Sequence, residues 1–464
     1  MPMKRRSFLK TAATAAFGSW FVPRHVLGGP GFVPPSEKVN IAIVGAGGQG
    51  TVNSRNLFRE ADAQIVALAD PMESVSLERF YYKGLGGRGP LQAEVEKHYA
   101  EQAPNFRCAA YEDFRVMLEQ ESAIDAVLCA TPDHLHAYVS VVAMRLGKHV
   151  YCEKPLTHNI WEARTVARVA KETGVATQMG NIGHSSEGIR RTVEYLRDGA
   201  IGTVREAHAW VPAGRWNPGL MGLPEGAPPV PAGLNWDLWL GPREPHPYHP
   251  AYVPVTWRDF WTFGCGALGD FGCHDLDATV WAFDLRAPDT IEALPAGFMN
   301  DDIAPYGEVC YYRFPARESQ PALQVNWYSG GLQPPRPDTL PEGMALPRRG
   351  VLFVGEKGII QCDGAGGPPR VFPNELREAY QQPEKTLLRS NGHHRDWLDA
   401  IKGGPPASSH FEDAARLTEI TLLGIVALRI GRQCRWDAAA MNVVGADKAE
   451  PIIKGTYRKG WEIT

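Results

Sequence analysis

A chain of 464 residues is too long for one ordinary hydrophobic core, so we expect two domains. The formal net charge of −4 and the lack of polybasic runs argue against nucleic acid as a partner. No uninterrupted apolar run reaches the roughly 18 residues of a membrane-spanning helix, so no transmembrane helix is expected.

The first 30 residues have the features of an export signal rather than of a folded segment. Lys4-Arg5-Arg6-Ser7-Phe8-Leu9-Lys10 precedes a mildly apolar stretch that runs to Val26. This pattern resembles a twin-arginine signal, although a lysine stands where serine or threonine usually precedes the arginines. We therefore expect a leader over residues 1–30 and a periplasmic or exported protein, membrane-tethered if the leader is not cleaved. A basic tail without a targeting role is the alternative.

A short apolar run over residues 39–44 leads directly into the glycine-rich sequence GAGGQG at residues 45–50. A buried strand followed by G-x-G-x-x-G is typical of a dinucleotide-binding unit. Gly45 would form the tight turn, Gly47 would let the backbone approach a pyrophosphate, and Gly50 would let the next helix pack closely. The predicted cofactor site also includes the two residues between these glycines, Gly48 and Gln49.

A second apolar run over residues 65–69 ends in Asp70. A carboxylate in this position can accept hydrogen bonds from ribose hydroxyls, and it repels a 2′-phosphate. We therefore expect NAD as the cofactor in preference to NADP. A glycine-rich turn in another kind of α/β protein is the alternative.

Strand and helix patterns then alternate along the chain. A strand over residues 124–130 ends in Thr131-Pro132-Asp133-His134-Leu135-His136, a helix follows at 137–146, and a strand at 148–152 leads into Glu153-Lys154-Pro155. Repeated βα units predict an α/β fold with a doubly wound parallel sheet. Both polar segments follow strands, so they should lie at the carboxyl edge, where ligands bind in such sheets.

These segments resemble the glucose–fructose oxidoreductase/inositol dehydrogenase/rhizopine catabolism (Gfo/Idh/MocA) family. The resemblance rests on A-T-P-D-H-x-H-A at residues 130–137, on E-K-P at 153–155, and on two later segments, 180–190 and 266–274, similar to the exported bacterial branch. It implies a Rossmann domain at 38–160, followed at 161–464 by an α/β domain with a large, mostly antiparallel sheet. That second domain commonly mediates oligomerisation, so a homodimer or homotetramer is expected. The implied cofactor contacts are Thr131, Pro132, His134, His136, Glu153 and Lys154.

Lys154 is the first expected catalytic residue. The E-K-P turn places it just past a strand end, beside the expected nicotinamide. A lysine held there can polarise a substrate hydroxyl and shuttle its proton. A surface lysine in a turn is the alternative.

Asp270 and His274 form the second expected constellation. Their i,i+4 spacing places both side chains on one face of a helix. The family pattern D-x-x-x-H implies that His274 is the base or proton relay and that Asp270 is a substrate ligand. A structural histidine at a helix start is the alternative, and Asp277 one turn later is expected to be a surface carboxylate.

Tryptophans are dense in the Pro- and Gly-rich stretch over residues 210–261. Indole rings over a pocket offer apolar faces to the C–H edges of a sugar. Trp257 and Arg258, just before the Asp270 motif, are the preferred substrate contacts. His184 is a further candidate substrate ligand, with a structural role as the alternative.

The eight cysteines are scattered and include no C-x-x-C pair, so neither a metal site nor a disulfide framework is expected. The sequence thus predicts an NAD-dependent oxidoreductase that acts on a secondary alcohol of a sugar, glycoside or cyclitol and retains its cofactor. A glycosidase or lyase that oxidises its substrate only transiently is one alternative, although no stretch matches the signature of the exported NAD-dependent glycosidases. A non-catalytic sugar-binding protein is the other.

Overall fold

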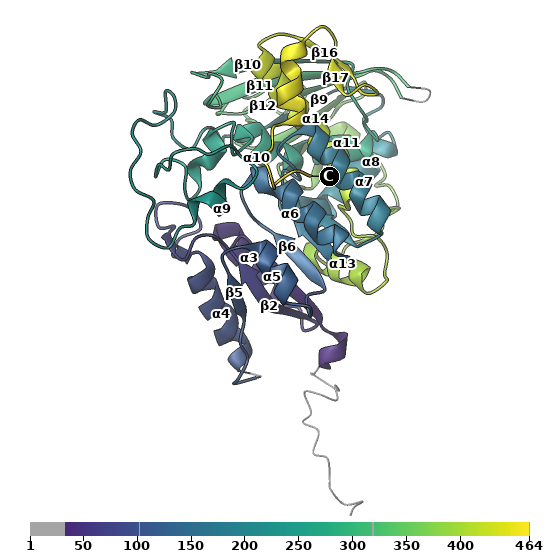
Figure 1. Ribbon diagram of the computed structural model, residues 1–464. Coiled ribbons are helices and arrows are strands. Elements are labelled where there is room, and N and C mark those ends of the chain that lie inside the picture. The colour runs from purple at the N-terminus through teal and green to yellow at the C-terminus, as the bar shows by residue number, and fades with distance from the viewer. Residues whose placement is uncertain (1–32, 102, 318–319, 464) are drawn as a thin grey trace, which may run out of the picture.

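The computed structural model describes residues 33–101, 103–317 and 320–463. The predicted leader at residues 1–30 lies outside them. The chain forms a lower domain from its first third and an upper domain built on a second sheet (Figure 1). None of the helices in the described residues is long and apolar enough to cross a membrane.

The lower domain is the predicted doubly wound parallel sheet, with strand order β5-β2-β1-β6-β7-β8. Its strands are β1 (Val39–Val44), β2 (Ala63–Ala69), β5 (Ala109–Tyr111), β6 (Ala126–Cys129), β7 (His149–Cys152) and β8 (Thr177–Met179). Its helices are α3 (Gly48–Leu57), α4 (Arg88–Ala100), α5 (Phe114–Gln120), α6 (Asp133–Arg145) and α7 (Ile160–Thr173). The strand order reverses at β1, and a crevice at the carboxyl ends of such strands is the usual ligand site.

This sheet extends beyond residue 160, where the sequence analysis placed the domain boundary. The segment expected to begin the second domain contains β8, which pairs in parallel with β7. Helix α7 connects β7 to β8. A capping box of Asn159 and Glu162 begins the helix, and Gly174, with φ of 67°, ends it.

The upper domain contains a nine-stranded sheet of order β15-β14-β13-β9-β12-β11-β10-β16-β17. Within the described part of this sheet, β9 and β12 form the only parallel pair, so the mostly antiparallel sheet is confirmed. The strands are β9 (Val204–Trp210), β10 (Thr290–Ala296), β11 (Gly307–Phe314), β12 (Leu323–Tyr328), β13 (Gly350–Gly355), β14 (Ile359–Asp363), β15 (Pro369–Phe372), β16 (Cys434–Asp437) and β17 (Asn442–Val443).

Helix α14 (Phe411–Ile430) joins the two domains, because it packs against α7 of the lower domain and against α10 (Gly266–Asp275) and β10 of the upper one. The remaining helices of this part are α8 (Glu187–Arg197), α9 (Trp236–Leu240), α11 (Asp277–Ala282), α12 (Asn374–Ala379) and α15 (Glu450–Lys454). Short 3-10 turns are η1 (Pro35–Glu37), η2 (Ile182–Ser185), η3 (Thr256–Asp259) and η4 (Asp447–Ala449).

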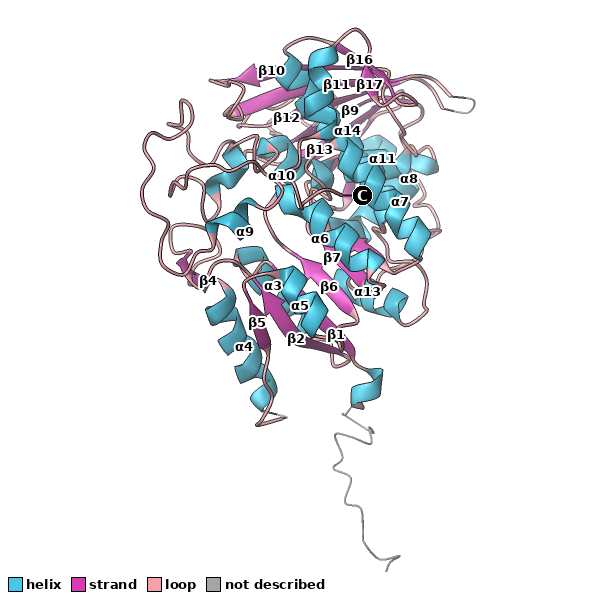
Figure 2. Ribbon diagram, viewed as in Figure 1, coloured by secondary structure: helices cyan, strands magenta, loops and turns pink. Residues whose placement is uncertain are grey.

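Helix α13 (His393–Ile401) returns the chain to the lower domain. Trp397 and Leu398 are fully buried in the core that contains β1 and β2, and Arg395 pairs with Asp62 at 2.7 Å. A small hairpin of β3 (Val75–Ser76) and β4 (Leu85–Gly86) follows β2. Figure 2 shows long loops on the same side of the molecule as β4 and α9.

Candidate active site

A cavity of about 1110 Å³ lies at the carboxyl ends of the parallel strands, between the two domains. The turns after β1, β2, β6 and β7 form one wall, and α10, η2, η3 and the loop before β13 form much of the other. A typical ligand pocket measures about 300–1000 Å³, so this space suits a dinucleotide together with a small substrate.

The glycine-rich turn lines one end of this cavity. Gly45 has a φ of 94°, which favours glycine. A Cβ at Gly47 would meet no atom of the described residues within 4 Å, so the backbone there is open to a ligand. No described side chain caps the start of α3, which leaves backbone N–H groups for an anion. These features fit the pyrophosphate of a dinucleotide.

Asp70 lies beside this turn, where it accepts hydrogen bonds from the backbone N–H of Ala46 at 2.7 Å and of Met72 at 2.8 Å. Burial raises the pKa of Asp70 to about 6 despite these bonds. The carboxyl group is therefore mainly ionised at neutral pH and can still accept from ribose hydroxyls.

Three residues predicted to contact the cofactor are held by contacts within the protein. Gly50 does not line the cavity. A Cβ there would overlap the carbonyl oxygen of Gly45, so glycine at this position allows α3 to approach β1 closely. His134 also lies away from it, with ring nitrogens 3.3 Å and 3.0 Å from the carbonyl oxygens of Phe263 and Trp239. His136 lines the cavity but holds two loops, with ring nitrogens 2.7 Å and 2.9 Å from the Pro155 and Thr131 carbonyl oxygens.

The contacts of the two His136 ring nitrogens also decide whether His136 could bind a metal. The potential ligand atoms of Cys129, His136 and Cys152 all lie within 4.8 Å of one another. Each ring nitrogen of His136 already faces a carbonyl oxygen at short distance, so neither is free for a metal. All eight cysteines are unpaired and buried.

Glu153 is a buried residue of the cavity wall and accepts hydrogen bonds from Asn53 at 2.8 Å and Gln49 at 3.3 Å. Thr131 and Pro132, at the end of β6, line the cavity as well. Five predicted contacts from three separate strand ends thus share one wall: Gln49, Thr131, Pro132, Glu153 and Lys154.

Lys154 and Asp270 make the closest charged contact in the cavity. The Lys154 Nζ donates to Asp270 Oδ1 at 2.5 Å and to the Asp270 backbone oxygen at 2.8 Å. Burial alone would lower the pKa of Lys154, but the Asp270 carboxylate raises it above the ordinary value. Lys154 is therefore a cation with one of its three donors left for another oxygen atom.

Arg258 is a second cation near the same carboxylate. Its Nε lies 3.5 Å from Asp270 Oδ1, and its guanidinium carbon lies 4.2 Å from the centroid of the Trp257 ring. Burial would raise the pKa of Asp270, but Lys154 and Arg258 hold it well below its usual range. Trp257 lines the cavity together with Trp216 and Trp239, whereas Trp210, Trp236 and Trp261 do not.

His274 lies one turn after Asp270 on α10, as the i,i+4 spacing predicts, and lines the cavity. Its Nδ1 is buried and has no hydrogen-bond partner among the described residues. Burial, followed by the nearby charges of Lys154 and Arg349, lowers the pKa of His274 well below its ordinary value. The imidazole is therefore neutral at neutral pH and able to accept a proton.

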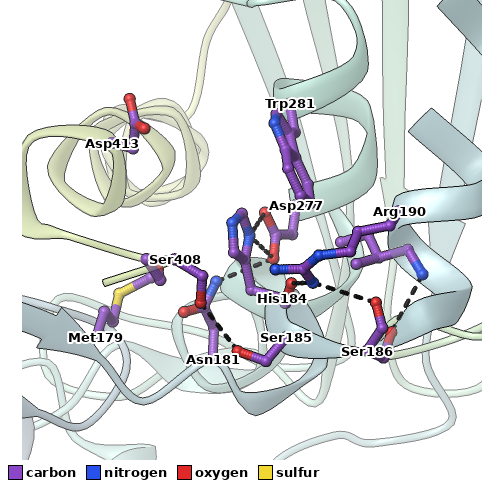
Figure 3. A network of polar contacts seen from close by, with 12 residues as sticks. Met179, Asn181, His184, Ser185, Ser186, Arg190, Asp277, Trp281, Ser408 and Asp413 are labelled. Atoms are coloured by element: carbon purple, nitrogen blue, oxygen red, sulfur yellow. Dashed lines mark hydrogen bonds and ion pairs between the residues drawn. The ribbon is translucent and has the colours of Figure 1, made fainter. Parts of the chain in front are cut away.

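His184, a predicted substrate ligand, does not line the cavity and belongs instead to the buried polar network drawn in Figure 3. Its Nδ1 lies 2.9 Å from both carboxylate oxygens of Asp277, and Asn181 donates to the same carboxylate at 2.9 Å. The ring stacks on Trp281 at 4.3 Å. Asp277 is only 3% exposed, so the expectation of a surface carboxylate is wrong.

This network links the loop after β8 to α11, which continues directly from the helix that carries Asp270 and His274. Arg190 of α8 donates to the His184 backbone oxygen at 2.6 Å and so fixes the same loop. The network therefore positions α10, through α11, relative to the loop that follows the parallel sheet.

Two family models match this chain. Residues 39–181 match an oxidoreductase family model for an NAD-binding Rossmann fold, and residues 215–312 match the C-terminal α/β domain of the same family. Together the matches span just over half of the chain. The chain belongs to the Gfo/Idh/MocA oxidoreductase family. Its lower domain is therefore an NAD-binding Rossmann domain.

Curated relatives of this Gfo/Idh/MocA protein align over limited regions. A 2,7-anhydro-N-acetylneuraminate hydratase from Mediterraneibacter gnavus is 26% identical over 173 residues, 37% of this chain and 39% of the relative. A scyllo-inositol 2-dehydrogenase (NAD(+)) from Bacillus subtilis is 29% identical over 145 residues, 31% of this chain and 36% of the relative. The alignments thus span under half of either relative.

Similarity to solved structures extends over a longer region of the chain. An NAD-binding protein from Listeria innocua superposes with a TM-score of 0.56 at 18% identity, over 86% of this chain and 97% of that one. The two-domain architecture is therefore common to both proteins.

Tyr82 and Arg349 are two residues of the cavity wall that were not predicted from the sequence. Tyr82, in the hairpin after β2, packs on Gly48 so closely that a Cβ there would overlap the phenol ring. Arg349, just before β13, is held by Asp275. Neither belongs to a local sequence motif that would indicate its place in the cavity.

Proposed function

We propose that this chain transfers hydride between a secondary alcohol of a sugar, glycoside or cyclitol and NAD. The observation that carries the proposal is the cluster of Lys154, Asp270 and His274 in the same cavity as the glycine-rich turn and Asp70. Bound NAD would supply the hydride acceptor. Gly45, Gly47 and Asp70 would hold it.

The residues of this chain divide the handling of the proton between them. Lys154 stays protonated and donates its free hydrogen to the substrate oxygen, which lowers the cost of removing the hydroxyl proton. His274 is neutral and takes that proton. Lys154 therefore polarises the substrate hydroxyl and His274 acts as the base, so the cation is not the proton acceptor.

Asp270 has two tasks in this scheme. It fixes the Lys154 ammonium through two hydrogen bonds, and it balances part of the charge of Arg258. Its carboxylate also has free lone pairs that can accept from a second hydroxyl of a polyol.

We further propose that the protein is exported and keeps its cofactor through many cycles, so that the net reaction is redox-neutral. Several contacts close the groove where the dinucleotide would lie. Tyr82 covers Gly48, and the Gly87 N–H donates to the Ala46 oxygen at 2.8 Å. The other domain supplies the Gly233 backbone oxygen, which accepts a hydrogen bond from the Glu73 N–H of the lower domain at 2.7 Å. A groove bridged by both domains favours slow dissociation.

A second candidate function is a lyase, hydratase or glycosidase that oxidises its substrate only transiently. The aligned Mediterraneibacter gnavus relative is named a hydratase, which is not a net oxidation. An oxidised carbon acidifies the neighbouring C–H, and the neutral His274 could then remove that proton before the hydride returns.

The two candidate functions differ in the product that accumulates. The test is to purify the protein without adding NAD, identify any bound cofactor by mass, and add sugars and cyclitols singly and in pairs. Ketone products that accumulate in paired reactions support net transfer between two sugars. Products of bond cleavage or hydration without ketones support the transient scheme. Absence of both, with a protein that binds sugar, would leave a non-catalytic binding protein.

A further inference from the structure

Arg349 lines the cavity from the segment just before β13, and its side chain is 29% exposed. Its Nε lies 3.1 Å from both oxygens of Asp275, and its Nη2 donates to Asp275 Oδ2 at 2.7 Å. Asp275 directly follows His274 on α10 and is completely buried. A carboxylate with this burial is present to hold the guanidinium, because an isolated buried charge is costly.

The guanidinium is confined on its other sides as well. Its central carbon lies 5.1 Å from the centroid of the Phe271 ring. A Cβ at Gly364 would lie 2.5 Å from Arg349 Cγ and 2.6 Å from Nε, so only glycine leaves room for the side chain. The backbone N–H of Ala365 donates to Asp275 at 2.9 Å and fixes this turn. Arg349 is therefore held rigidly before any ligand arrives.

One edge of this guanidinium remains free. Asp275 takes the edge formed by Nε and Nη2, and Nη1 has no partner among the described residues. The planar group therefore offers two parallel N–H donors from Nη1 and Nη2, the geometry that a carboxylate matches with its two oxygens.

The charges at this end of the cavity also favour an anion. Lys154, Arg258 and Arg349 are paired with only two carboxylates, those of Asp270 and Asp275. A further carboxyl, that of Asp133, is 4% exposed, and burial raises its pKa to about 7, so it is only partly charged at neutral pH. Glu153, beside Lys154 in the same wall, is another buried carboxyl whose pKa burial raises, so the three cations face two paired carboxylates and two carboxyls with raised pKa values.

Arg349 and Lys154 lie near the same aromatic ring. The Lys154 Nζ is 5.9 Å from the Phe271 centroid, and the Arg349 carbon is 5.1 Å from it. Both cations also act on the pKa of His274, so a sugar bound beside His274 could contact Lys154 through the reacting hydroxyl and Arg349 through another substituent.

We propose that Arg349 is a specificity-determining residue that binds a carboxylate, and that the substrates are sugar acids rather than neutral sugars. This inference rests on the proposed function for the choice of a sugar. It adds the chemical class of the group that Arg349 binds. Asp275 acts through Arg349 and is a positioning residue.

The test compares hexuronates with their parent aldohexoses in the full-length protein, by titration of tryptophan fluorescence, since three tryptophans line the cavity. Each uronate should bind roughly tenfold to a hundredfold tighter than its parent, as expected for charged hydrogen bonds. Arg349→Met should bring this ratio close to one, and Arg349→Lys should lower it. Arg348→Met, which removes an exposed neighbouring charge, should keep the wild-type ratio.

A parent sugar that binds as tightly as its uronate would overturn the proposal, as would the failure of every uronate to bind. An unchanged ratio in folded Arg349→Met would do so as well. If that variant does not fold, the wild-type ratio and Arg349→Lys decide. Arg349-dependent binding of a uronate with no reduction of the bound cofactor would overturn the proposed oxidation and leave this assignment standing.

Discussion

The Asp270 carboxylate lies 2.5 Å from the Lys154 ammonium, although the two residues come from different domains. Lys154 follows β7 of the parallel sheet, and Asp270 lies on α10 of the upper domain. The contact keeps Lys154 protonated and anchors the helix that also carries His274. One ion pair thus couples the arrangement of the domains to the chemistry.

Lys154→Ala should lower kcat by on the order of 10² to 10⁴, the usual effect of losing a proton-handling group. NAD binding should persist, because the glycine-rich turn and Asp70 are unaffected. Initial rates and cofactor titration measure the two effects. Lys171→Ala, at an exposed position in the last turn of α7, is the control. Near wild-type turnover in Lys154→Ala would remove this residue from the mechanism.

Asp270→Asn should destabilise the fold at neutral pH by on the order of 2–3 kcal/mol, since it leaves Lys154 and Arg258 without a carboxylate. Side chains of Lys154 and Asp270 are 16% and 13% exposed, which makes the loss smaller than for a fully buried pair. Denaturant unfolding of both proteins gives the difference.

The pH dependence of that difference follows from the two shifted pKa values. The pKa of Asp270 is lowered from 3.8, so its contribution is present above about pH 4 and is lost as the pH falls. The pKa of Lys154 is raised from 10.5, so its contribution is present below that pH and is lost as the pH rises. A difference in unfolding free energy that stays as large at low and at high pH as it is at neutral pH would contradict the ion pair.

His274 should act as a base in mildly acidic solution, because its pKa lies well below 6.5. Asp133 also lines the cavity with a pKa of about 7, so kcat/KM is best followed in Asp133→Asn, which removes that second titration. We expect the acidic limb of this profile well below pH 6.5. A limb above pH 6.5 in this variant, beyond the pKa of about 6 of Asp70, would show that His274 is not the base.

Asp70→Asn should narrow the preference for NAD over NADP, roughly tenfold, by removing the charge that faces the ribose. The amide oxygen can still accept one of the two backbone hydrogen bonds. Dissociation constants for both cofactors measure the change, with Asp125→Asn, at the opposite end of the sheet, as control. If the wild type already binds NADP more tightly, the interpretation of Asp70 is wrong.

Tyr82→Ala should speed the release of NAD, on the order of tenfold, because the ring no longer covers the start of α3. Stopped-flow displacement of bound cofactor gives the rate. Leu85→Ala changes a 59% exposed residue of the same hairpin and should leave the rate unaltered. Equal release rates in Tyr82→Ala and wild type would argue against this cover.

Local patterns predicted most of the parallel sheet and the cavity residues that follow β1, β2, β6 and β7 or lie on α10. The glycine-rich turn, Asp70 and the E-K-P turn directly follow strands, and the carboxyl ends of parallel strands meet at one edge. Asp270 and His274 share a helix face because of their spacing alone.

The positions of Arg349 and His184 depend on contacts that no local sequence pattern encodes. Arg349 meets Asp275 across 74 positions of sequence, and His184 meets Asp277 across 93. A polar side chain in a loop suits a cavity or a buried network equally, so residue type could not exclude His184. The domain boundary was placed too early because a strand pattern does not show which sheet the strand joins, and β8 pairs with β7 of the parallel sheet.

The central claim is that a cofactor held in this cavity exchanges hydride with a sugar hydroxyl under the control of Lys154 and His274. The most direct measurement is the absorbance of the reduced nicotinamide in protein purified without added NAD, before and after a sugar acid or a neutral sugar is mixed in. We predict bound NAD that becomes reduced within one turnover in the wild type and far more slowly in Lys154→Ala. Protein that carries no cofactor, or bound NAD that no sugar reduces, would contradict the account.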